Sequence, residues 1–176
     1  MGRSTAVVDH LTSWVESPEG ASPPADRELL MAAIGWAGEA GRSQEVLRLC
    51  RGIERALMAA GLWGEWQLVL EHAAVAARQL GDQLALGWAL HQLGTLALCR
   101  ENYGAAQRLL GQALAVRERA RDAEGAVVTR HNLEVLAWLT APPGHGSPPS
   151  TGRGAVKPDG GRGQVTFPFP CAPLSK

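Results

Sequence analysis

Apolar residues recur with the 3.6-residue period of an α-helix along most of the chain, which predicts a series of amphipathic helices. After a short N-terminal helix that carries Val7, Leu11 and Trp14, the predicted helices span about 26–41, 43–60, 63–80, 83–100, 103–120 and 123–139. Asp26 and Ser43 are the predicted N-caps of the first two, because their short polar side chains accept hydrogen bonds from backbone N–H groups. Short turns such as Gly81-Asp82 make neighbouring helices antiparallel.

The apolar pattern also repeats along the chain, and the successive copies align without a gap. Leu93 aligns with Ile53 and Leu133, and His91 aligns with His131. A period of about 40 residues is typical of stacked helical hairpins, each of which has an apolar face that only its neighbours can bury. We therefore expect an all-α fold: an antiparallel helical-hairpin repeat array that forms an α-α superhelix.

Prolines divide the chain into three parts, because a proline inside a helix removes a hydrogen bond and clashes with the preceding turn. None of the 11 prolines lies in residues 25–141, and residues 25–140 are the predicted helical repeat domain. Residues 1–24 are predicted to hold a short helix and a proline-containing linker. In residues 141–176, 15 of 36 residues are Pro or Gly, which predicts a disordered C-terminal tail.

Charge excludes some classes of partner. The whole chain has 17 basic and 17 acidic residues, but residues 1–140 hold 13 arginines, 16 acidic residues and no lysine. A nucleic-acid partner is not expected for this part, since phosphate binding needs a basic stripe. No apolar run approaches the roughly 20 residues of a membrane span, and the first residues do not have the pattern of a secretory signal. The expected location is the cytoplasm.

One segment resembles the tetratricopeptide repeat (TPR). From Leu90 to Val116, the matching residues are Leu90, Leu93, Gly94, Ala97, Tyr103, Ala106, Leu110 and Ala113. Gly94 and Ala106 are small where two helices of a hairpin cross closely, and Leu110 supplies apolar filling. The flanking units depart from the pattern, because Glu54 and Glu134 replace the glycine and Trp66 replaces the small Ala106.

A wider resemblance covers about residues 25–140. The stretches 32–37, 61–66, 89–94 and 129–133, taken in that order, resemble the C-terminal helical sensor arm of bacterial STAND/NB-ARC-type signalling ATPases. The resemblance implies a sensor or adaptor arm that recognises a protein or peptide. It does not supply the ATPase, because neither Lys157 nor Lys176 follows a phosphate-binding glycine loop.

The TPR resemblance also implies a binding groove, lined by the first helix of each hairpin. The groove-facing residues carried over by the match are Arg48, Arg51, Arg55, Trp88, His91, Gln92, Thr95, His131, Asn132 and Val135. Such a basic and polar groove suits an acidic side chain or the terminal carboxylate of an extended peptide. The alternative is that the arginines are solvated, or pair with Glu45 and Glu54, and that the histidines are ordinary helix residues.

The expected function is therefore a non-catalytic scaffold for protein–protein contact, with no cofactor and no metal. His91 and His131 lack the further ligands that a structural metal site needs. Two alternatives stay open: a detached regulatory arm that docks to a separate nucleotide-binding ATPase, and a homodimerising structural module. Both would use the last predicted helix, whose apolar residues are Leu133, Leu136, Trp138 and Leu139.

Overall fold

The computed structural model describes residues 2–15 and 23–142, and all regular structure in these two ranges is α-helical. The helices are α1 (Gly2–Val15), α2 (Pro23–Glu39), α3 (Ser43–Ala59), α4 (Trp63–Leu80), α5 (Gln83–Cys99), α6 (Tyr103–Arg119) and α7 (Ala123–Thr140). The predicted all-α fold is confirmed for this part of the chain. The predicted tail lies outside the described residues, apart from Ala141 and Pro142, and so does most of the predicted linker.

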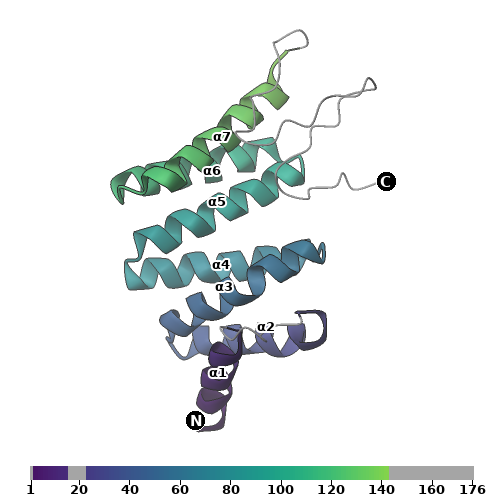
Figure 1. Ribbon diagram of the computed structural model, residues 1–176, viewed down its shortest axis with the longest axis vertical. Helices are drawn as coiled ribbons and strands as arrows, with labels where there is room; N and C mark the ends of the chain where they lie inside the picture. The colour runs from purple at the N-terminus through teal and green to yellow at the C-terminus, as the bar shows by residue number, and fades with distance from the viewer. Residues whose placement is uncertain (1, 16–22, 143–176) are drawn as a thin grey trace.

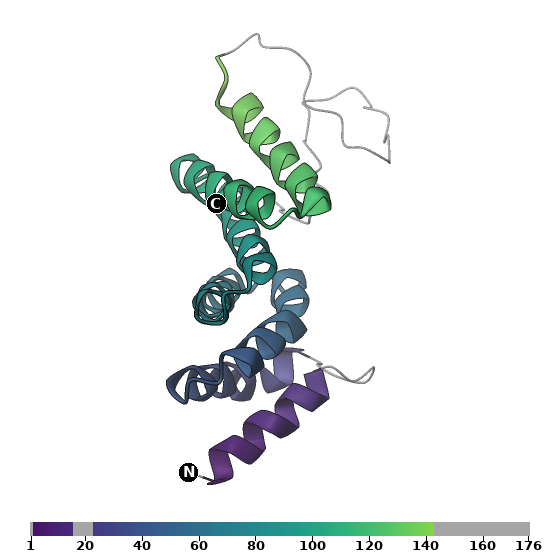
Figure 2. The same ribbon diagram turned by 90° about the vertical axis from the view of Figure 1, so that its left-hand side faces the viewer.

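The helices stack in chain order along the long axis of the molecule, from α1 at one end to α7 at the other (Figure 1). Seen from the side, successive helices alternate between two layers (Figure 2). From α2 onward the helices begin at positions 23, 43, 63, 83, 103 and 123, so their starts are evenly spaced. Between α2 and α7 the chain takes a left-handed backbone conformation once in each turn, at Gly41, Gly61, Gly81, Glu101 and Arg121. The turns therefore share one geometry, whether or not a glycine is present.

Helix starts agree with the predictions at most positions and differ at two. Asp82, Asn102 and Asp122 cap α5, α6 and α7 by accepting hydrogen bonds from Ala85, Ala105 and Gly125, respectively. The predicted cap at Ser43 is wrong, because Ser43 is the first helical residue and its hydroxyl instead donates to Gln79 Oε1 at 2.5 Å. The predicted start at Asp26 is also wrong, since α2 begins at Pro23, where proline fits the first turn of a helix.

The closest packing lies between α5 and α6. A Cβ atom built on Gly94 would lie 2.7 Å from Leu110 Cγ and 3.1 Å from the Leu110 backbone nitrogen. Ala106 is fully buried at the same crossing. The prediction that small residues occupy this crossing is confirmed, and α5 and α6 pack closely there.

Candidate functional site

Buried polar side chains join α5 to α7. Asn132 Nδ2 donates to Thr95 Oγ1 at 2.9 Å, and the Thr95 hydroxyl donates to the His91 carbonyl at 3.0 Å. Thr129 Oγ1 lies 3.2 Å from His91 Nδ1 and donates to the Gly125 carbonyl at 2.9 Å. A hydroxyl has a single hydrogen, so the arrangement is satisfied when the His91 Nδ1–H donates to Thr129. These contacts fix α7 over α5.

Arg117 of α6 completes this buried cluster. Its Nη1 donates to Thr129 Oγ1 at 2.8 Å and to the Gly125 carbonyl, and its Nε lies 3.6 Å from Asp122 Oδ2. Burial lowers the pKa of the Arg117 guanidinium, while the Asp122 carboxylate opposes that shift. Burial, with a smaller contribution from Arg117, also lowers the pKa of His91 to about 4. His91 is therefore a neutral structural imidazole near neutral pH.

A second set of polar contacts joins α3 to α5. Glu54 Oε1 accepts hydrogen bonds from Gln92 Nε2 at 2.8 Å and from Trp66 Nε1 at 3.3 Å. The Arg51 guanidinium carbon lies 4.7 Å from the centroid of the Trp88 ring, which is a cation–π contact. Burial raises the pKa of Glu54, and the hydrogen bond from Trp66 is the largest of the opposing effects. The Glu54 carboxylate thus points inward and is held by these two hydrogen bonds.

The predicted groove residues fall into three groups by exposure. Arg48, Arg51 and Arg55 are exposed, Trp88, Gln92 and His131 are half-buried, and His91, Thr95, Asn132 and Val135 are buried. The buried group packs between α5 and α7, so it is not presented to a partner in this arrangement. The three side chains expected to form a ladder, Arg51, His91 and His131, consequently differ in exposure.

The structure does bring one part of the predicted groove together on the surface. Arg48, Arg51 and Arg55 lie on one side of α3, at helical spacings of three and four residues, and the middle one, Arg51, stacks over the Trp88 ring of α5. We refer to these four residues as the α3–α5 face. The alternative pairing of the arginines with Glu45 is not seen for Arg51 or Arg55, because Glu45 pairs with Arg42 at 2.8 Å.

The four apolar residues named for the last helix differ in exposure. Leu136 is buried in a cluster with Leu98, Ala106 and Val135, so it is not available to a partner, whereas Leu133, Trp138 and Leu139 are half-buried. The large apolar side chains that α7 exposes are instead Val127 and Val128, which are 62% and 46% exposed.

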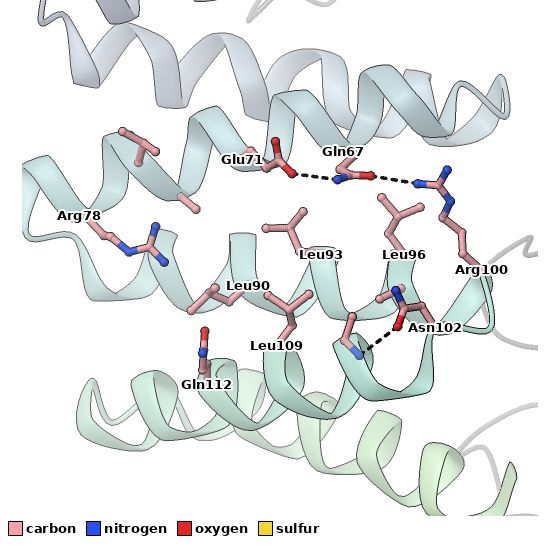
Figure 3. A pocket seen from close by; sticks show the side chains of 14 residues that line it. Gln67, Glu71, Arg78, Leu90, Leu93, Leu96, Arg100, Asn102, Leu109 and Gln112 are labelled. Carbon is pink, nitrogen blue, oxygen red and sulfur yellow. Dashed lines mark hydrogen bonds between the residues drawn. The ribbon is translucent and has the colours of Figure 1, made fainter. Parts of the chain in front are cut away.

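A groove of about 580 Å³ that the sequence did not predict lies between α4 and α6, with α5 at its base (Figure 3). Leu90, Leu93 and Leu96 of α5 and Leu109 of α6 provide its apolar floor. Its polar rim is formed by Gln67, Glu71, Arg78, Arg100, Asn102 and Gln112. The available signal was the high apolar content of residues 83–99, which is typical of a helix covered from several directions.

Two further features concern metals and membranes. Among the described residues, no cluster of three or more His, Cys, Asp or Glu side chains could hold a metal ion. Within residues 2–15 and 23–142, no helix combines the length and the apolar character needed to cross a bilayer.

No family model matches the chain, and no curated protein or solved structure matches it either. Candidate functional residues are accordingly identified from their own contacts, burial and charge. By these criteria the two candidate binding surfaces are the α3–α5 face and the groove between α4 and α6.

Proposed function

We propose that this protein is a non-catalytic, TPR-like scaffold that binds an acidic segment of another protein on the α3–α5 face. The observation that supports this most is the Arg51 guanidinium, held 4.7 Å from the Trp88 ring while it stays exposed. A stacked arginine is already ordered before a ligand arrives, so less side-chain entropy is lost when it binds a carboxylate.

The charge of the α3–α5 face favours an acidic ligand. Among the described residues, neither Arg51 nor Arg55 has a carboxylate within ion-pair distance, although Glu54 lies between them in the sequence. Glu54 Oε1 instead faces Trp66 and Gln92. Two arginines on adjacent turns of one helix suit a carboxylate pair or a chain-terminal carboxylate, through charge-assisted hydrogen bonds.

The biological setting of this proposal comes from the resemblance to the sensor arms of STAND-type ATPases. In that setting the chain is a sensor or adaptor arm in bacterial signalling, located in the cytoplasm, and docking to a separate ATPase module is the related alternative. The even spacing of the helix starts from α2 to α7 supports the repeat architecture that such arms have.

The test is binding of labelled peptides to the full chain, followed by fluorescence anisotropy. One peptide is glutamate-rich with a free terminal carboxylate, and its matched control has glutamine in place of glutamate. We expect the acidic peptide to bind more tightly, with an affinity that falls as salt is added. The double variant R51Q/R55Q should raise Kd at least about tenfold, whereas R119Q, an exposed arginine of α6, serves as the control variant. Equal binding by R51Q/R55Q and wild type would contradict the proposal.

A homodimerising module is the second candidate, and the exposure of Val127 and Val128 on α7 favours it. Exposed β-branched side chains next to each other on the last described helix suit contact with a second copy. Light scattering of the wild type and of V127D tests this candidate. A concentration-dependent dimer that V127D dissociates supports it, and a monomer at every concentration contradicts it.

A further inference from the structure

The groove between α4 and α6 faces away from the α3–α5 face. Trp88, Gln92 and Thr95 follow one side of α5, whereas Leu90, Leu93 and Ala97 follow the opposite side, about 180° around the helix. A ligand in the groove therefore contacts none of the arginines of α3. The groove is a second and separate surface, which goes beyond the function proposed above.

The floor and the rim of the groove differ in chemistry (Figure 3). Four leucines form the floor, and Leu93 and Leu109 among them are only half-buried. The apolar surface continues outward onto α4, where Val75 is 51% exposed. It also borders a second groove of about 490 Å³ between α2 and α4, which shares Glu71 and Val75 with the first. An apolar strip of this kind suits the apolar side of an amphipathic helix.

Two arginines mark the ends of the groove. Arg100 Nη1 donates to Gln67 Oε1 at 2.9 Å, which places Arg100 beside position 67 of α4. Arg78 lies further along α4 and, among the described residues, its guanidinium makes no hydrogen bond or ion pair. Positions 67 and 78 are about three helical turns, or about 16 Å, apart, so they lie on the same side of α4. Neither arginine has a carboxylate partner in the described part of the chain.

Glu71 lies on α4 between these two ends. Its Oε1 accepts a hydrogen bond from Gln67 Nε2 at 2.9 Å, so its carboxylate stays at the rim. An acidic group opposite Glu71 would be repelled, whereas an acidic group at either end would meet an arginine. The rim thus favours carboxylates at the two ends of a ligand and disfavours one in the middle.

We propose that the groove between α4 and α6 binds an amphipathic helix of a partner protein. The helix lies along α4 and places leucine-like side chains on Leu93 and Leu109. Two of its acidic residues, about 16 Å and three turns apart, pair with Arg78 and Arg100. The residue between them that faces Glu71 is neutral or basic.

The experiment measures binding of a designed helical peptide to the full chain by fluorescence anisotropy. The peptide has two glutamates separated by three turns, with leucines on the same side between them. One control peptide replaces both glutamates with glutamine, and a second moves one glutamate to the middle of the leucine side. We expect the designed peptide to bind at least about tenfold more tightly than either control.

Protein variants complete the test. R78Q/R100Q should raise the Kd of the designed peptide at least about tenfold and remove the preference for glutamate over glutamine. Both substituted side chains are exposed, so the fold is kept, and R119Q on another part of α6 should bind like the wild type. R51Q/R55Q should leave this Kd unchanged, which separates the result from that of the α3–α5 face.

Three results would overturn the proposal. One is absence of binding by the designed peptide, and another is equal binding by wild type and R78Q/R100Q. The third is a dimer of the wild type that R78Q/R100Q dissociates, because the occupant would then be a second copy of this chain.

Discussion

The hairpins α3–α4 and α5–α6 follow each other along the chain, yet their helices cross through opposite kinds of side chain. In α5–α6 the crossing has Gly94 and Ala106, and there is no room for a Cβ atom at Gly94. In α3–α4 the residues 40 positions earlier are Glu54 and Trp66, whose side chains hydrogen-bond to each other at 3.3 Å. The two hairpins therefore cross either through small residues in close contact or through a large aromatic residue hydrogen-bonded to a carboxylate.

The contacts of α5 with α3 and with α7 also differ in chemistry. Glu54 to Gln92 and Arg51 to Trp88 link α3 with α5, whereas His91 to Thr129 and Thr95 to Asn132 link α5 with α7. The two partners of each pair are almost equally far apart in the sequence. The α3–α5 link keeps a cation at the surface, whereas the α5–α7 link buries a neutral imidazole. The α3–α5 contacts thus leave an accessible charged surface, whereas the α5–α7 contacts form a buried structural joint.

Trp66 gives the largest expected effect. Its side chain is 1% exposed. Trp66→Ala would make the α3–α4 crossing resemble the α5–α6 crossing only if α3 and α4 moved together and closed the resulting cavity. We expect incomplete closure and a decrease of about 3–5 kcal/mol in the free energy of unfolding, measured by urea denaturation. Trp36→Ala, which removes a tryptophan that is 44% exposed, is the matched control and should have a much smaller effect. A loss below about 1 kcal/mol for Trp66→Ala would show that the two crossings are interchangeable.

His91 gives a pH-dependent effect in the α5–α7 joint. Its pKa in the folded chain is about 4, below the ordinary value of 6.5, so folding favours the neutral ring. The stability that follows from this is present above pH 6.5 and is lost as the pH falls toward 4, by up to about 3 kcal/mol. His91→Gln, which keeps an N–H donor for Thr129, should flatten the profile of unfolding free energy in this window. His10→Gln, at an exposed histidine of α1, is the control, and equal slopes for wild type and His91→Gln would refute the buried neutral ring.

Gly94 and Gly111 provide a matched pair of substitutions. Both are helical glycines, but a Cβ on Gly94 meets Leu110 at 2.7 Å, whereas a Cβ on Gly111 meets nothing within 4 Å. Gly94→Ala should lower the free energy of unfolding by about 1–3 kcal/mol through overpacking. Gly111→Ala should raise it by about 0.5–1 kcal/mol, because alanine favours the helix. Thermal unfolding checks both, and a stabilised Gly94→Ala variant would mean that α5 and α6 cross less closely than described.

The sequence predicts the helices well because apolar residues recur through them without proline and short polar turns separate them, as at Gly81 and Asp82. It also indicates the close crossing at Gly94, since a glycine in the TPR-like pattern has a packing role. It does not show which helix covers a given polar side chain, so His91 and Asn132 were expected at the surface. Their burial depends on α7 lying over α5. The groove between α4 and α6 is equally hidden in the sequence, because it depends on the space left between three helices.

Glu54 gives the smallest expected effect and one of opposite sign to that of His91. Burial raises its pKa in the folded chain, so this carboxyl contributes stability at low pH that is lost as the pH rises through the raised pKa. Glu54→Gln keeps an oxygen that can accept from Trp66 and Gln92, and it removes the charge. The free energy of unfolding at neutral pH should change by less than about 1 kcal/mol, and the stabilising contribution of Glu54 on acidification should disappear. On acidification His91 lowers the free energy of unfolding and Glu54 raises it. His91→Gln removes the first effect and Glu54→Gln the second, so the two variants should depart from the wild-type pH profile in opposite directions. Departures in the same direction would mean that Glu54 and His91 do not shift the pH dependence of stability with opposite signs.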